Sequence, residues 1–118
     1  MNEHEQSDDA LAELLTLTVE VDKWGVSYRN HLGLFHRVHG PAYISIENNK
    51  HWYRNSKLHR EDGPAIEYAN GDNWWFQNDE PHRIDGPAFQ RVSGNHDWCL
   101  HGEYLTEEEW NERIKSLL

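Results

Sequence analysis

The chain has 118 residues, enough for one domain or one short repeat array but too few for a large two-domain enzyme. Its formal net charge is −10, yet residues 23–102 carry nine acidic and nine basic side chains, so the excess negative charge lies at the two ends. A phosphate-binding surface would need clustered Lys and Arg, so this distribution makes direct nucleic-acid binding an unfavoured function.

Residues 1–22 form an acidic N-terminal segment with seven acidic residues and neither Lys nor Arg. We expect a short helix from Asp8 or Asp9 through Leu15 and a strand near residues 17–21, with the extreme end disordered. The segment has no basic start followed by an apolar run, as a secretory signal would.

The sequence has no run approaching the roughly 18 apolar residues of a membrane helix. Its single cysteine, Cys99, cannot form an internal disulfide and is expected to be a buried small hydrophobic residue. A cytoplasmic protein without membrane contact is therefore predicted.

A 23-residue repeat runs through residues 23–105, the predicted body of the protein. Shifting the sequence by 23 aligns three segments of the form His-Arg-x-x-Gly-Pro-Ala, and the fourth residue is Asp in the second and third of them. Tyr28-Arg29-Asn30 marks a degenerate earlier copy. The aligned positions are residues 36–42, 59–65 and 82–88, together with Trp52, Trp75 and Trp98.

Turn residues divide each copy into short strands. Asn70-Gly71 lies between the expected strands 65–69 and 73–77 and predicts a type I′ hairpin turn. A second turn is expected after each Trp-containing strand, at Asn55-Ser56, Asn78-Asp79 and His101-Gly102. The pattern predicts a mainly β fold of tandem 23-residue antiparallel β-hairpins, arranged as a meander or solenoid-like sheet.

Residues 106–118 predict a C-terminal helix that caps the repeat array. Thr106 and Glu109 fit a capping box as N-cap and N3. An apolar stripe at helical spacing is expected to cover the open end of the sheet, as terminal caps do in solenoids. Its members are Trp110, Ile114, Leu117 and Leu118.

The repeat unit resembles the MORN repeat, whose pattern is aromatic-x-Asn-Gly-x-x-His followed by Gly. Residues 53–59 and 76–82 carry the resemblance, with Ser56 and Asp79 in place of the usual Gly. The His-Arg-x-Asp-Gly-Pro-Ala segment looks like a variant found in small bacteriophage and large-virus proteins. The resemblance implies a β-hairpin meander used as a scaffold or binding surface, with no catalytic residues and with a host protein as partner.

The repeated polar residues are predicted to hold the fold together. An active site needs one constellation in one cleft, whereas a group present in every unit normally belongs to the folding of the unit. Arg60 with Asp62 and Arg83 with Asp85 are interpreted as pairs that brace turns, and the first copy, with His39 instead of Asp, must be braced differently. The predicted structural residues are His36, Arg37, His59, Arg60, Asp62, His82, Arg83 and Asp85.

A metal site among these histidines is disfavoured by distance. Equivalent residues one two-stranded repeat apart are separated by about 10 Å, since neighbouring strands lie about 4.8 Å apart. Two nitrogen ligands of one zinc ion each lie only about 2.0–2.1 Å from it, so His36, His59 and His82 cannot share a metal. No metal, cofactor or catalytic residue is therefore predicted.

Trp74 does not recur in the neighbouring copies, which have His51 and Asp97 at its position. We interpret this as an accessible face without a packing role, on which Phe76 and Tyr53 join an aromatic patch. Exposed aromatic residues often dominate binding interfaces. The predicted binding residues are Trp74, Phe76, Tyr53 and His51.

The leading hypothesis is a non-enzymatic protein-interaction module, and the resemblance implies that it is encoded by a phage and directed at a host protein such as a defence component. An acidic nucleic-acid mimic that blocks a DNA- or RNA-binding protein is the alternative. A hydrolase that uses His and Asp is the least favoured reading. The oligomeric state and the partner's identity are not encoded in any motif.

Overall fold

The computed structural model describes the backbone of residues 3–118 and the side chains of residues 8–118, and it is mainly β. Its helices are α1 (Glu3–Leu14) near the N-terminus and α2 (Glu107–Leu117) at the C-terminus. Within the described residues, no helix is both long and apolar enough to cross a lipid bilayer. The expected disorder of the extreme N-terminal end concerns residues that lie outside this description.

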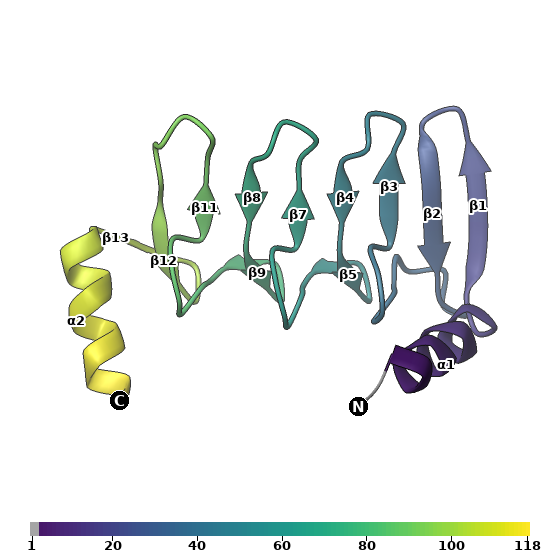
Figure 1. Cartoon of the computed structure of the whole chain (residues 1–118), viewed down its shortest axis with the longest axis horizontal. Coiled ribbons are helices and arrows are strands. Elements are labelled where there is room, and N and C mark those ends of the chain that lie inside the picture. The colour runs from purple at the N-terminus through teal and green to yellow at the C-terminus, as the bar shows by residue number, and fades with distance from the viewer. Residues whose placement is uncertain (1–2) are drawn as a thin grey trace.

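In the described part of the chain, the largest sheet has seven antiparallel strands whose spatial order follows the sequence. Figure 1 shows these strands as a row of upright hairpins between the two ends of the molecule. The strands are β1 (Thr18–Asp22), β2 (Gly25–Arg29), β3 (Tyr43–Ser45), β4 (Lys50–His51), β7 (Ile66–Glu67), β8 (Asn73–Trp74) and β11 (Phe89–Gln90).

The remaining strands of residues 3–118 form separate two-stranded hairpins, and Figure 1 draws β5 and β9 below the main row. The pairs are β5 (Tyr53–Arg54) with β6 (Lys57–Leu58), β9 (Phe76–Gln77) with β10 (Glu80–Pro81), and β12 (Trp98–Leu100) with β13 (Glu103–Leu105).

The expected continuous strand at residues 73–77 is therefore wrong, because the chain leaves the main sheet at Trp75. The backbone N–H of Trp75 donates to the carbonyl of Ala88 (2.8 Å), and that of Trp52 donates in the same way to Ala65 (2.7 Å). Past each of these residues the chain enters a small hairpin instead of extending the sheet.

The turns of these small hairpins are those expected after the Trp-containing strands. Asn55 and Ser56 have φ of 50° and 62°, and Asn78 and Asp79 have 49° and 67°, so both central residues are left-handed, as a type I′ turn requires. The type I′ turn predicted at Asn70-Gly71 is wrong, because Gly71 has a positive φ there and Asn70 does not.

The buried core is small and centres on one row of cross-strand neighbours. Tyr43, His51, Ile66, Trp74 and Phe89 lie opposite one another on successive strands and so share one face of the sheet. The alanines that end the repeated segments are fully buried beside this row, as is Cys99. Small residues let the chain pass close to the sheet where each hairpin begins.

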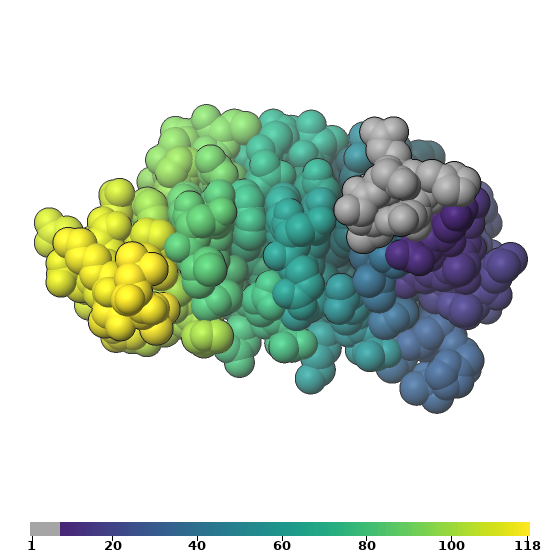
Figure 2. All heavy atoms as spheres, turned by 60° about the horizontal axis from the view of Figure 1, so that its bottom comes forward, coloured from purple at the N-terminus to yellow at the C-terminus, as the bar shows by residue number. Residues whose placement is uncertain are grey.

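Helix α2 begins with the expected capping box. The Thr106 side chain accepts from the Glu109 backbone N–H (3.1 Å), and the Glu109 carboxylate accepts from the Thr106 backbone N–H (2.9 Å). Trp110 is buried, with its ring centroid 4.8 Å from that of Trp98. Ile114 is half-buried, whereas Leu117 and Leu118 are exposed, so the predicted apolar stripe is wrong for these last two residues. Figure 2 shows α2 at one end of the elongated body.

At the other end, α1 is longer than the helix expected from Asp8 or Asp9, and it contacts the first repeated segment. The Glu13 carboxylate accepts hydrogen bonds from the backbone N–H groups of Val38 (2.6 Å) and His39 (2.8 Å). The chain then forms β1, close to the expected residues 17–21, and β1 continues the main sheet through its pairing with β2.

Candidate functional site

The repeated segments form a row of loops, here called the His-Arg loops, at residues 36–42, 59–65 and 82–88, and the third and fourth residues of each loop are exposed. The arginine of each loop stacks on an aromatic ring. The guanidinium carbon of Arg60 lies 3.8 Å from the ring centroid of Trp52, and that of Arg83 lies 3.7 Å from Trp75. Such stacking of a cation on an indole is attractive and holds the arginine flat.

The glycine of each His-Arg loop is needed because the guanidinium covers it. A Cβ atom at Gly63 would lie 2.9 Å from Cζ of Arg60, and one at Gly86 would lie 2.7 Å from Cζ of Arg83. Real Cβ atoms do not approach other atoms so closely. The motif thus encodes a layered arrangement of indole, guanidinium and glycine backbone.

The same arginines fasten the loop by hydrogen bonds. Arg83 donates from Nε to Asp85 (2.8 Å) and from a terminal nitrogen to the carbonyl of Pro87 (3.1 Å). Arg60 donates in the same way to Asp62 (3.0 Å) and to Pro64 (3.1 Å). The Arg60–Asp62 and Arg83–Asp85 pairs are thus formed, and their contribution to the stability of the turns stays a prediction.

The histidines connect successive loops. Nδ1 of His36 accepts from the backbone N–H of Asn55 (3.1 Å), Nδ1 of His59 from Asn78 (3.1 Å), and Nδ1 of His82 from His101 (2.8 Å). An imidazole nitrogen that accepts a backbone hydrogen bond must be unprotonated. Burial lowers the pKa of His82, and the nearby His101 lowers it further. The histidines are thus placed for the structural role predicted for them, which stays a prediction.

The first His-Arg loop is braced differently, as its His39 implied. The guanidinium of Arg37 lies over Tyr28 (4.3 Å), and its Nε is buried without a hydrogen-bond partner among the residues with described side chains. The carboxylate at this loop comes instead from Glu13 of α1. Sequence reasoning did not identify Glu13, because nothing in the local sequence of a helix tells which distant loop it contacts.

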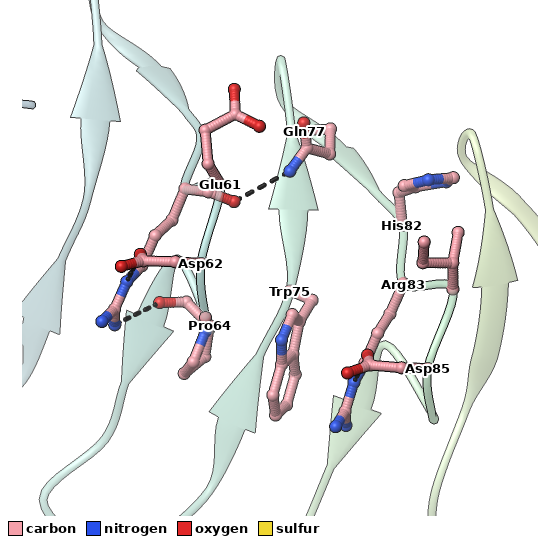
Figure 3. Close-up of a pocket in the computed structure, with 11 residues that line it drawn as sticks. Glu61, Asp62, Pro64, Trp75, Gln77, His82, Arg83 and Asp85 are labelled. Carbon is pink, nitrogen blue, oxygen red and sulfur yellow. Dashed lines mark hydrogen bonds and ion pairs between the residues drawn. The ribbon is translucent and has the colours of Figure 1, made fainter. Parts of the chain in front are cut away.

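A groove of about 710 Å³ opens between the second and third loops. Figure 3 shows Trp75 between the two loops, and Gln77 anchors one wall by donating to the carbonyl of Arg60 (2.8 Å). The rim carries the exposed side chains of Ile84 and Asp85. The lining residues are Arg60, Glu61, Asp62, Gly63, Pro64, Trp75, Gln77, His82, Arg83, Ile84 and Asp85.

A smaller groove of about 240 Å³ occupies the corresponding place between the first and second loops. Trp52 and Arg54 line it where Trp75 and Gln77 line the larger one. The surface therefore offers an indole and a stacked arginine more than once along the row. Carboxylates at the rims are solvent-exposed, with 81% of the Asp62 side chain and 77% of the Asp85 side chain accessible.

The structure brings the predicted binding residues His51, Tyr53, Trp74 and Phe76 into one aromatic cluster, but all four are half-buried. Trp74 packs edge-on against Tyr68 and Phe89, with ring centroids 5.0 and 4.9 Å away. The expected open face without a packing role is wrong for Trp74, because cross-strand neighbours place its ring in the core row. Whether these four residues bind a partner stays a prediction.

Among the described residues, no cluster of three or more His, Cys, Asp or Glu side chains is placed to hold a metal ion. Burial raises the pKa of the Cys99 thiol to about 11, so it is almost entirely protonated near neutral pH. Comparison with protein-family models, curated proteins and solved structures finds no match to this chain.

Proposed function

We propose that the chain is a non-enzymatic protein-interaction module built from tandem 23-residue β-hairpin repeats, with the grooves between the His-Arg loops as its binding surface. The observation that carries the proposal is the recurrence of one groove architecture at two neighbouring places along the row. Solenoid proteins use such repeated surfaces to bind extended partners.

The chemistry of the larger groove suits a protein ligand. An indole floor and an exposed Ile84 supply apolar contact area, while Gln77 and the exposed Asp62 and Asp85 supply polar contacts at the edges. A mixed surface with an aromatic centre and a polar rim is typical of protein interfaces. The arginines are held by their own loops, so little side-chain entropy is lost when a partner binds.

The resemblance to MORN repeats and to their variant in phage and large-virus proteins extends the proposal. On that basis the protein acts in the host cytoplasm, and its partner is a host protein that it occupies or inhibits. A regular surface of this kind needs no cofactor and no catalytic group to act as an inhibitor.

Affinity capture with a matched pair of variants tests the groove. Ile84→Arg places a bulky charge on the rim, where Ile84 is 60% exposed, and Val92→Arg makes the same change at a residue 69% exposed that does not line the groove. We expect Ile84→Arg to weaken a partner captured from bacterial lysate by about tenfold or more, and Val92→Arg to leave it unchanged. Equal binding by both variants would contradict the groove as the binding surface.

Salt dependence separates this proposal from an acidic nucleic-acid mimic. Acidic ends that imitate a phosphate backbone should lose the partner steeply as ionic strength rises. A groove with an indole floor should retain most of its affinity. A steep loss that is insensitive to Ile84→Arg would support the mimic and reject the groove.

A further inference from the structure

The two ends of the row of strands differ in what covers them. At the C-terminal end, α2 packs beside β12, and Trp110 donates from its indole nitrogen to the carbonyl of Arg83 (3.0 Å). At the N-terminal end, β1 is the edge strand, paired on one side with β2, and all five of its residues are exposed. Figure 1 shows β1 as the last upright strand, with α1 below it.

The backbone of β1 directs hydrogen-bonding groups to this open edge. Tyr28 of β2 uses its N–H for Ala42 (2.7 Å) and its carbonyl for His36 (3.0 Å), both on the side away from β1. Its opposite neighbour Val19 therefore points its own N–H and carbonyl outward, and Val21 does the same by the alternation of an antiparallel ladder. An extended chain laid along β1 would meet these groups in register.

Apolar side chains accompany the open edge. Val21 is 75% exposed, Trp24 in the β1–β2 turn 62%, and Ile46, just after β3, 72%. The backbone N–H of Ile46 donates to the carbonyl of Trp24 (2.8 Å), which holds these two segments together. Among the described residues, the edge thus combines backbone groups that have no partner strand with an exposed apolar surface, a combination that most proteins avoid unless it is used.

The negative charge on and near β1 favours a basic strand as its partner. Glu20 is exposed on the opposite face of β1 from Val19 and Val21, and its side chain forms neither a hydrogen bond nor an ion pair with the described residues. Residues 1–22 carry seven acidic residues without a single Lys or Arg. A second copy is disfavoured, because the fully paired antiparallel register of two β1 strands would set Glu20 against Glu20.

We propose that β1 is a docking edge for an extended segment of a partner protein in which basic residues alternate with β-branched apolar residues. The segment adds a strand to the sheet through Val19 and Val21, places its basic side chains beside Glu20, and packs its apolar side chains with Val21. This is β-strand addition, in which the main chain supplies affinity and alternate side chains supply specificity. The proposal concerns a different surface from the grooves and does not depend on them.

A synthetic octapeptide of alternating lysine and valine tests the edge with the full chain. We expect its binding to slow amide hydrogen exchange at Val19 and Val21 and to shift their backbone NMR signals. The same peptide with N-methyl groups on its valines, whose N–H groups face β1, cannot complete the ladder. It should bind about tenfold more weakly or worse. An alternating glutamate and valine peptide should not bind.

Two variants of the protein complete the test. Glu20→Lys should reverse the preference, so that the glutamate peptide binds and the lysine peptide does not. Val19→Pro removes an outward N–H without breaking the bond pattern to β2, so a folded variant should lose the lysine peptide. Unchanged preference in Glu20→Lys, equal binding of the N-methylated peptide, or NMR shifts confined to residues away from β1 would each overturn the proposal. So would dimerisation of the free protein through β1 in sedimentation experiments.

Discussion

Arg83 gathers several interactions in one side chain. Its guanidinium stacks on Trp75, lies against Gly86, and donates to Asp85 and to the carbonyl of Pro87. Only 16% of the arginine side chain is accessible, whereas 77% of the Asp85 side chain is. The two members of this ion pair therefore contribute unequally to stability.

Removing either member should separate these contributions. We expect Asp85→Ala to lower the free energy of unfolding by at most about 1 kcal/mol, because the exposed carboxylate is screened by water. Arg83→Ala should lower it by about 2 kcal/mol or more, since stacking and a carbonyl bond are lost together. Urea unfolding of both variants measures the two free energies of unfolding. Equal decreases would show that the arginine stabilises the fold only through its ion pair with Asp85.

Cys99 offers a direct probe of burial. The thiol is fully buried and its pKa is raised to about 11, so almost no thiolate is present near neutral pH. We expect iodoacetamide to leave Cys99 unmodified in the folded protein and to alkylate it rapidly in urea. Mass spectrometry measures the difference, and rapid alkylation without denaturant would contradict the packing of β12.

At the scale of elements, hydrogen bonds to the histidines join successive hairpins. Each histidine accepts a backbone hydrogen bond from the small hairpin that follows it. At His82, a proton on Nδ1 would break that link. His82 also stacks on His101, with ring centroids 4.0 Å apart. The link at His82 therefore depends on pH.

Stability should fall as the solution becomes acidic. Burial and His101 lower the pKa of His82 below its ordinary 6.5, against an opposing effect of Glu80. The unfolded chain therefore binds this proton more tightly, so the stabilisation is complete above about pH 6.5 and is lost as pH falls through the lower folded-state pKa. Burial lowers the pKa of His51 as well, which adds to the same trend.

His82→Asn provides the matched control, because the amide oxygen can accept the same hydrogen bond without titrating. We expect the melting temperature of the variant to change less between about pH 7.5 and pH 5.5 than that of the unmodified protein. Identical pH profiles for the two proteins would assign the dependence to other groups.

The whole molecule is a single row in which each hairpin packs on its neighbours, with extents of 45 × 33 × 27 Å. Its core is thin, and aromatic rings fill it from one strand to the next. Trp74 and Trp75 are adjacent in sequence but make different contacts. Trp74 belongs to the aromatic row, whereas Trp75 supports an arginine at the groove.

Substitution of each tryptophan by alanine tests this division. We expect both Trp74→Ala and Trp75→Ala to lower the free energy of unfolding by about 2 kcal/mol or more, because each ring is half-buried and packed. Thermal melts give the comparison, beside binding measurements on the captured partner. If Trp74→Ala melts normally and loses the partner, the aromatic cluster is the binding site and the groove is not.

Local sequence was sufficient wherever the interactions are local. The capping box of α2 lies within four residues, and the left-handed turns at Asn55-Ser56 and Asn78-Asp79 need only residues that tolerate a positive φ. The bracing of Arg60 by Asp62 spans two residues, so its spacing alone revealed it. These features made the mainly β class and the C-terminal helix predictable.

The tertiary structure decided what depends on distant partners. Trp74 seemed free because its neighbours in other copies are polar, but its environment is set by Phe89 on an adjacent strand, and cross-strand contacts leave no mark within a repeat. The contact of Glu13 with the first loop and the grooves between loops likewise arise only when segments 20 or more residues apart are brought together. Local bonds follow from adjacent residues, whereas burial and surface shape follow from how the hairpins stack.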